Sequence, residues 1–279
     1  MKRMIMYVLV STYSMAVLAQ QDSTRNESTS VDTIRVGNFI IIKKEANGNT
    51  NVDISRQPGK ARPKKNIRTN WWIVDLGYAG FNDITDYNSA GAKAFMPNAG
   101  STPINAGDFS LGSFRVSNFN LWFFMRTHNL SRHVLNLKYG FGIESNNYFY
   151  KTNLTYVDGA NPYVIRDNVD FSKNKLVASY LTVPLMLNIN TAPNERRKAL
   201  QISAGVSTGL LYRARQKQIS DDRGKQKQST NFNLERWKMS LVGELGLGPV
   251  KFYGSYALTP LHRYGVEQLP YNVGIRLGN

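Results

Sequence analysis

Cysteine is absent from the 279 residues of this chain. That absence excludes a disulfide framework, a thiolate nucleophile and a cysteine-ligated zinc site, and it argues against a lipoprotein anchor. Long apolar runs are also missing, because after the N-terminus no stretch approaches the roughly 20 apolar residues that a spanning helix needs. If the mature protein lives in a membrane, it must therefore cross that membrane with strands.

Acidic residues are few: 19 stand against 35 basic ones, for a formal net charge of +16. In a cytoplasmic protein this balance would indicate nucleic acid. The N-terminus argues otherwise, because Lys2 and Arg3 precede an apolar run that ends at the small residue Ala19, as in a secretory signal. We therefore predict a signal peptide over residues 1–19. We expect the positive charge to meet lipopolysaccharide phosphates or other anionic envelope polymers, and no nucleic acid.

Residues 20–68 are mostly polar and are predicted to form a periplasmic N-terminal segment. Within them, the apolar residues of Asp32 to Lys44 predict one short strand. The rest is typical of a linker. Its end, Arg56 to Arg68, places basic residues around two prolines and a glycine, which favours an extended tether. This tether is either a solvated run of charge or a contact with an anionic surface just below the membrane.

From Trp71 onward, apolar and polar residues alternate with a period of two, which indicates strands with two chemically different faces. The clearest case is Val134 to Ser145, where Leu135 and Leu137 share one face and Asn136 lies on the other. In a soluble sandwich the apolar face would be the core, whereas in an outer-membrane barrel it would meet lipid.

Connection lengths decide between these two folds. Long connections are expected at residues 82–112, 151–175, 217–235 and 259–269, and short turns at 130–133, 191–198 and 248–249. This alternation predicts an all-β fold: a closed antiparallel transmembrane β-barrel of about eight strands over residues 69–279. The long loops would be extracellular, the short turns periplasmic, and both chain ends would lie in the periplasm.

Aromatic residues are expected to mark the two membrane interfaces, because amphipathic rings favour the headgroup zone. Trp71 and Trp72 lie at the predicted inner end of the first strand. The predicted outer ends carry Tyr78, Phe81, Tyr148 to Tyr150, Tyr180, Tyr212 and Trp237.

The stretch from Trp71 to Asn279 resembles the porin-family, PorT-like outer-membrane β-barrel proteins of diderm bacteria. The resemblance rests on Tyr180 to Leu187 (YLTVPLML), Leu137 to Tyr148, the closing strand Tyr271 to Leu277, and the upstream stretch Asp32 to Lys44. The run from Asn272 to Leu277 is also similar to the C-terminal signal read by barrel-assembly machinery, although it lacks a terminal aromatic residue. The resemblance implies an outer-membrane location and a barrel fold, but no specific activity.

Charged residues at predicted inward positions form the candidate site. They are Asp75, Lys138, Glu144, Glu244, Lys251 and Arg276. Charges inside a narrow barrel must pair or stay hydrated. Asp75 on the first strand and Arg276 on the last would become neighbours when the barrel closes. Because about eight strands leave room for little but side chains, a structural lumen network is favoured over a conduction path.

Some eight-stranded outer-membrane barrels are lipid-modifying hydrolases, so histidine and serine pairs need attention. His128 and His133 flank a turn that contains Ser131, and His262 lies in the last long loop. No GxSxG elbow, HExxH helix or phosphate-binding glycine loop is present. We predict a protein that is not an enzyme, with no metal and no cofactor.

The leading hypothesis is a structural or interaction barrel that contacts outer-membrane lipid, lipopolysaccharide, barrel-assembly machinery and other envelope proteins. The alternatives are a narrow porin for small solutes, an outer-membrane lipid-modifying hydrolase, and a secreted soluble β-protein that binds an acidic ligand. The loop at 83–110 is adaptable in composition and the one at 213–236 is strongly basic. Either loop could hold a partner or be a mobile surface segment.

Overall fold

The computed structural model describes residues 30–36, 39–46, 49–56, 65–97, 102–112, 117–193, 199–247 and 250–278. The chain divides into two compact units, residues 1–64 and 65–279, which are described separately. The predicted signal peptide and residues 57–64 of the basic tether lie outside the described residues. Where the chain is described, no helix is both long enough and apolar enough to cross a membrane.

The first unit contains a three-stranded antiparallel sheet in the order β1-β2-β3. The strands are β1 (Ser30–Val36), β2 (Phe39–Ala46) and β3 (Asn49–Arg56). The single short strand predicted for Asp32 to Lys44 is therefore wrong, and residues 49–56 form a strand where a linker was expected. The reason lies in two dipeptides, Gly37-Asn38 and Asn47-Gly48, whose residue types favour two-residue hairpin connections.

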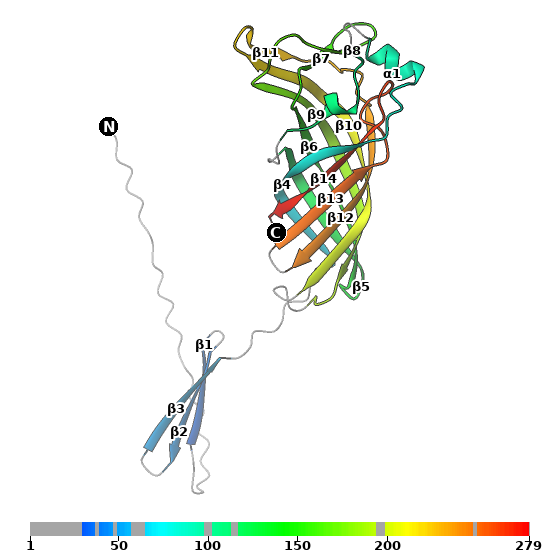
Figure 1. The fold of residues 1–279 in the computed structure, drawn as a ribbon. Coiled ribbons are helices and arrows are strands. Elements are labelled where there is room, and N and C mark those ends of the chain that lie inside the picture. The colour runs from blue at the N-terminus through cyan, green and yellow to red at the C-terminus, as the bar shows by residue number, and fades with distance from the viewer. Residues whose placement is uncertain are drawn as a thin grey trace, which may run out of the picture. The chain divides into compact units, whose positions relative to one another are not determined.

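The second unit is built on eight long antiparallel strands among its described residues (Figure 1). They are β4 (Ile67–Asp83), β5 (Asn118–Ser131), β6 (Leu135–Tyr150), β9 (Lys173–Asn190), β10 (Leu200–Ser220), β12 (Trp237–Leu247), β13 (Val250–Ala257) and β14 (Gln268–Leu277). Pairing runs β10-β12-β13-β14-β4-β5-β6-β9, and β9 pairs in turn with β10. Each strand thus has a hydrogen-bonded neighbour on both edges, which removes the exposed edges of an open sheet.

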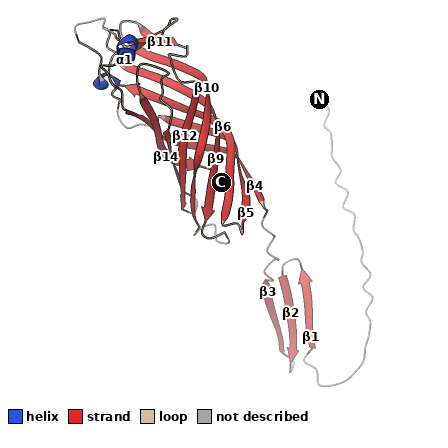
Figure 2. Cartoon of the chain, turned by 90° about the vertical axis from the view of Figure 1, so that its right-hand side faces the viewer, coloured by secondary structure: helices blue, strands red, loops and turns tan. Residues whose placement is uncertain are grey.

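The connections differ at the two ends of this ring. The long ones carry α1 (Ala90–Phe95), the 3-10 helix η1 (Ala106–Phe109), the hairpin β7 (Leu154–Val157) and β8 (Tyr163–Arg166), and β11 (Gly224–Gln228). Figures 1 and 2 show α1 and β11 at the same end of the ring. The other end has the short connections β5–β6, β9–β10 and β12–β13. We call these the loop end and the turn end.

Side chains alternate between the two faces of the ring wall. On β9, Val183, Leu185 and Leu187 are about half exposed, whereas Met186 and Asn188 between and after them are buried. β12 repeats the pattern with Met239, Leu241 and Leu245 on the outside. The outside is therefore aliphatic and the inside largely polar, a contiguous apolar surface of the kind that marks a membrane or partner contact.

The aromatic prediction was partly wrong. Trp71 and Trp72 are each 66% exposed on the outside, but Tyr148 and Tyr180 are buried in the interior. Both tyrosines lie at even-numbered positions of β6 and β9, which face inward, so alternation places them inside the ring. The two tryptophans share the outside because Trp72 has a φ of 55°, a left-handed conformation that interrupts the alternation.

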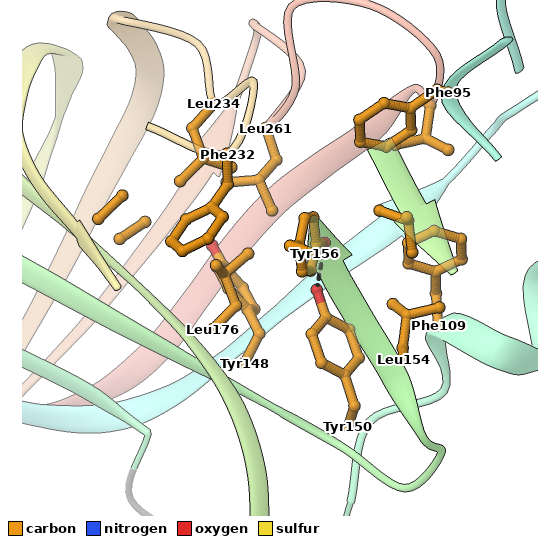
Figure 3. Close-up of a cluster of buried hydrophobic side chains, with 14 of the residues drawn as sticks. Phe95, Phe109, Tyr148, Tyr150, Leu154, Tyr156, Leu176, Phe232, Leu234 and Leu261 are labelled. Carbon is orange, nitrogen blue, oxygen red and sulfur yellow. Dashed lines mark hydrogen bonds between the residues drawn. The ribbon is translucent and has the colours of Figure 1, made fainter. Parts of the chain in front are cut away.

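The loop end is closed by a packed hydrophobic cluster, the outer cap (Figure 3). Its largest members are Phe95, Phe109, Tyr148, Tyr150, Leu154, Tyr156, Leu176, Phe232, Leu234 and Leu261. The Tyr150 and Tyr156 hydroxyls hydrogen-bond at 2.9 Å. Arg166 of β8 binds Asp108 of η1 through two nitrogens, with distances of 2.8 and 2.9 Å. The long connections are thus joined to one another and to the strand ends.

Candidate functional site

The six predicted inward charges come from five strands. Asp75 lies on β4, Lys138 and Glu144 on β6, Glu244 on β12, Lys251 on β13 and Arg276 on β14. Asp75, Glu144 and Arg276 are almost fully buried. Since a buried charge without a partner costs several kcal/mol, roughly as much as a domain's net stability, the pairing of these groups determines whether the ring is stable.

The seam between the first and last strands of the ring carries an ion pair. Asp75 and Arg276 lie opposite each other in the β4–β14 register. Arg276 donates from Nε to Asp75 Oδ1 at 2.7 Å and from a terminal nitrogen to Oδ2 at 2.8 Å. Asp75 also accepts hydrogen bonds from Trp122 Nε1 at 2.7 Å and from the Asn120 amide at 3.2 Å. The predicted pairing across the seam is therefore present, in the bidentate geometry that arginine favours.

The chain of charges continues across the interior. The other terminal nitrogen of Arg276 donates to one carboxylate oxygen of Glu244, and the second oxygen of Glu244 accepts from Lys138. The order Asp75, Arg276, Glu244, Lys138 alternates in sign, so each charge has an opposite neighbour. It joins four strands, β4, β14, β12 and β6, across the interior.

Glu144 forms a second centre with Lys238, a residue that the sequence analysis did not include in the network. The Glu144 carboxylate also accepts from the Asn272 amide at 2.9 Å and from Asn146 at 3.0 Å. Lys238 lies 4.9 Å from the centre of the Tyr180 ring. The sequence carries a signal for this residue: Lys238 is six residues before Glu244 on the same strand, so strand alternation places both side chains on the inward side.

Lys251 is placed differently from the other five. It is half-buried and lies opposite Arg276 in the β13–β14 register. Arg276 in turn binds Asp75 and Glu244.

Little space is left between these groups. A cavity of about 30 Å³ lies among Asp75, Trp122, Glu144, Glu244 and Arg276, which is room for about two water molecules. Glycine makes the close packing possible at one point. A Cβ on Gly142 would lie 2.5 Å from the Leu121 carbonyl oxygen and 2.8 Å from the Trp122 ring. At this level the interior is therefore filled by side chains.

The catalytic alternative depends on His128, Ser131 and His133. His128 and Ser131 are exposed at the turn end, and the backbone N–H of His133 donates to the Asn129 side chain at 2.7 Å. In the described part of the chain, no hydrogen bond joins Ser131 to either histidine, as a nucleophile and its base would need. Among all the residues that the structure describes, no three histidine or carboxylate side chains are grouped so that they could hold a metal ion.

His262 belongs to the outer cap instead. It stacks on Tyr156, with ring centres 5.7 Å apart and planes inclined by 6°, and it contacts Phe95 at 5.3 Å. Burial lowers the pKa of His262 to about 3. The imidazole is therefore neutral at physiological pH and serves as a packing group.

The comparison with protein families agrees with this architecture. Residues 78–264, about two thirds of the chain, match the family model described as outer membrane protein beta-barrel domain. The search of curated proteins found no match. Among solved structures, the chain is similar to Ail, the attachment invasion locus protein of Yersinia pestis, in complex with the heparin analogue sucrose octasulfate. That similarity has a TM-score of 0.29 and 8% identity, and covers 75% of this chain and 98% of that one. The family match shows that this chain belongs to the outer membrane protein beta-barrel domain family.

Proposed function

We propose that the protein is a sealed outer-membrane β-barrel with a structural or interaction role in the cell envelope and no enzymatic activity. The observation that carries the proposal is the filled interior: oppositely charged side chains join across the ring, and the outer cap packs over its loop end. A continuous water-filled path needs space that eight strands with this many inward side chains do not leave. This favours a closed barrel over a narrow porin.

The proposed orientation follows the rule for this class of barrel. The loop end with its outer cap faces the outside, and the turn end, with both chain ends, faces the periplasm. The three-stranded N-terminal sheet would then be periplasmic. A PorT-like subfamily, assembly by barrel-assembly machinery, and contacts with lipopolysaccharide and other envelope proteins are parts of the same proposal.

Conductance in planar lipid bilayers tests the sealed interior. We expect purified protein, shown to be folded by its heat-dependent electrophoretic shift, to insert without discrete conductance steps. A porin of known conductance, inserted in the same bilayers, serves as the positive control. Regular current steps from the natural chain would contradict the proposal and support the porin alternative.

The absence of cysteine makes the orientation simple to test, because a single introduced thiol is the sole labelling site. Asp222→Cys lies in the exposed turn between β10 and β11, and Ser131→Cys lies at the exposed end of β5. A membrane-impermeant maleimide should label the Asp222→Cys variant in whole cells. It should label the Ser131→Cys variant only after the cells are lysed. The reverse pattern would place the loop end in the periplasm.

A hydrolase would need a nucleophile in reach of a base, which the described contacts of Ser131 do not supply. Incubation with lipid A followed by mass spectrometry tests this part of the proposal. We expect the acyl chains to remain in place. Loss of an acyl chain that is abolished by Ser131→Ala would overturn it.

A further inference from the structure

The outward side of β9 and β10 changes chemistry along the strands. Starting from the turn end, the paired outward residues are Ile189 with Ile202, Leu187 with Ala204, Leu185 with Val206, Val183 with Thr208, and Leu181 with Leu210. Tyr212, about half exposed, closes this apolar stretch. The ten steps from Ile202 to Tyr212, at about 3.4 Å per residue and a tilt of about 40°, rise roughly 26 Å. That height matches the apolar band of an outer-membrane barrel.

Above Tyr212 the same outward side becomes basic. A bulge between Leu211 and Arg213 shifts the alternation of β10, so that odd-numbered residues face outward from there on. We call the following six cations the basic face: Lys173, Lys175, Arg215, Lys217, Lys225 and Lys227.

Strand register places these cations side by side. Lys217 of β10 lies opposite Lys175 of β9 on one edge and opposite Lys227 of β11 on the other. One step further from the membrane, Lys173 and Lys225 both lie opposite Ile219. Five of the six cations therefore form two rows across three hydrogen-bonded strands, and Arg215, opposite Val177, lies one step nearer the apolar stretch.

Nothing on this face compensates the charge. The outward positions of these strand segments, all of them described, carry no aspartate or glutamate. Like charges directly opposite in a sheet destabilise it. Partial burial and neighbouring cations, Lys173 first among them, lower the pKa of Lys175 to about 8. Partial desolvation and then Lys225 lower the pKa of Lys217. An anion bound here would relieve this repulsion.

The position of the face decides which anion is nearest. At the same rise and tilt, Arg215 lies roughly 8 Å and Lys217 roughly 13 Å above the apolar band. This is the headgroup layer. Because the cations point outward from the wall, above the lipid-facing side chains, they face the surrounding leaflet. Lys175 also lies 5.2 Å from the centre of the Phe149 ring and donates to Asn147 at 2.6 Å, which holds it against the wall.

We propose that the basic face binds phosphate groups of the lipopolysaccharide that surrounds the barrel in the outer leaflet. The inference rests on the proposed orientation, because this leaflet surrounds the face only if the loop end is outside. A row of three lysines suits a headgroup that carries more than one phosphate, since several cations engage the same molecule at once. The site would anchor the barrel laterally and order the lipid next to β9, β10 and β11.

The test uses the full chain, folded in nonionic detergent and titrated with rough-form lipopolysaccharide, with binding measured by thermophoresis. The variant Lys175→Gln/Lys217→Gln/Lys227→Gln removes the middle row. The control, Lys93→Gln/Arg236→Gln/Arg263→Gln, removes the same charge from exposed positions outside the basic face. We expect the first to weaken binding by about 10- to 100-fold and the control by less than about threefold.

Three further comparisons test whether phosphate groups of lipopolysaccharide are what the basic face binds. Enzymatically dephosphorylated lipopolysaccharide should bind as weakly to the natural chain as the intact form binds to the basic-face variant. Equal losses in the basic-face and control variants would overturn the site, because net charge alone would then explain binding. Equal affinity for phosphatidylglycerol micelles would overturn lipopolysaccharide as the occupant. The heat-dependent electrophoretic shift confirms that each variant folds, and thiol labelling together with conductance reports separately on the proposed function.

Discussion

Substituting Arg276 with methionine removes the central cation of the interior network while keeping similar side-chain bulk. The change deletes two hydrogen bonds to Asp75 and one to Glu244. Asp75, which has no exposed surface, then keeps only the donors of Trp122 and Asn120. Breaking one side of a buried ion pair costs about 3–5 kcal/mol, because the remaining charge stays desolvated.

For a domain of this size, about 1 kcal/mol lowers the melting temperature by roughly 2–4 °C, so Arg276→Met should melt about 6–20 °C lower. The assay heats folded samples over a range of temperatures and measures the folded fraction by electrophoresis without boiling. The control Arg126→Met removes an exposed arginine that contacts Thr69, and should shift melting by about 2 °C or less.

A second substitution separates lost charge pairing from lost packing. Adding Asp75→Asn to Arg276→Met removes the stranded carboxylate and leaves an amide oxygen to accept from Trp122 and Asn120. We expect the double variant to regain part of the lost stability, which a double-mutant cycle reports as a coupling energy. If Arg276→Met melts like the natural chain, or if the double variant melts no higher than the single one, the reasoning about buried pairing is wrong.

Three further predictions follow from the outer cap, the membrane interface and the packed interior. The pKa of His262 is about 3 in the folded protein and 6.5 as an unperturbed group, so between these values the unfolded chain takes up a proton that the folded protein does not. The stabilisation from the neutral imidazole is therefore complete above pH 6.5 and falls as the pH drops toward 3. Between pH 7.5 and 5 the loss is about 2 kcal/mol. His262→Phe should melt with a smaller drop between those two pH values than the natural chain, and an equal drop would refute the assignment. In vesicles with brominated lipids, single-tryptophan chains should show strong quenching for the exposed Trp71 and Trp72 and weak quenching for the buried Trp122; equal quenching would argue against the proposed faces. Gly142→Ala should lower stability by about 1–3 kcal/mol in urea titration, since its Cβ meets backbone, and an unchanged midpoint would contradict that close packing.

Local patterns in the sequence were enough for the wall of the barrel. Alternation of period two assigned Leu185 to the outside and Glu244 to the inside, because the side-chain direction in a strand depends only on position along it. The same logic paired Asp75 with Arg276, since closure makes the first and last strands neighbours. Turn dipeptides at residues 37–38 and 47–48 carry the signal for the N-terminal sheet, whereas the apolar residues of Asp32 to Lys44 alone predict a single strand.

Contacts between distant segments were decided by the tertiary structure alone. Glu144 pairs with Lys238 across the interior, 94 positions along the chain. The outer cap joins Phe95, Tyr156 and His262 from three separate connections, whose sequences resemble surface loops when read singly. The rows of the basic face likewise depend on strand register and on one bulge in β10.

The sequence by itself thus determined the strand pattern, the approximate strand number and which charges face inward, because each of these depends on neighbouring residues only. The tertiary structure determined which charge meets which, how the loop end closes and where cations gather above the apolar band. These features depend on register, shear and the folding of long connections. Such properties arise when strands far apart in the chain become neighbours, and no local pattern encodes them.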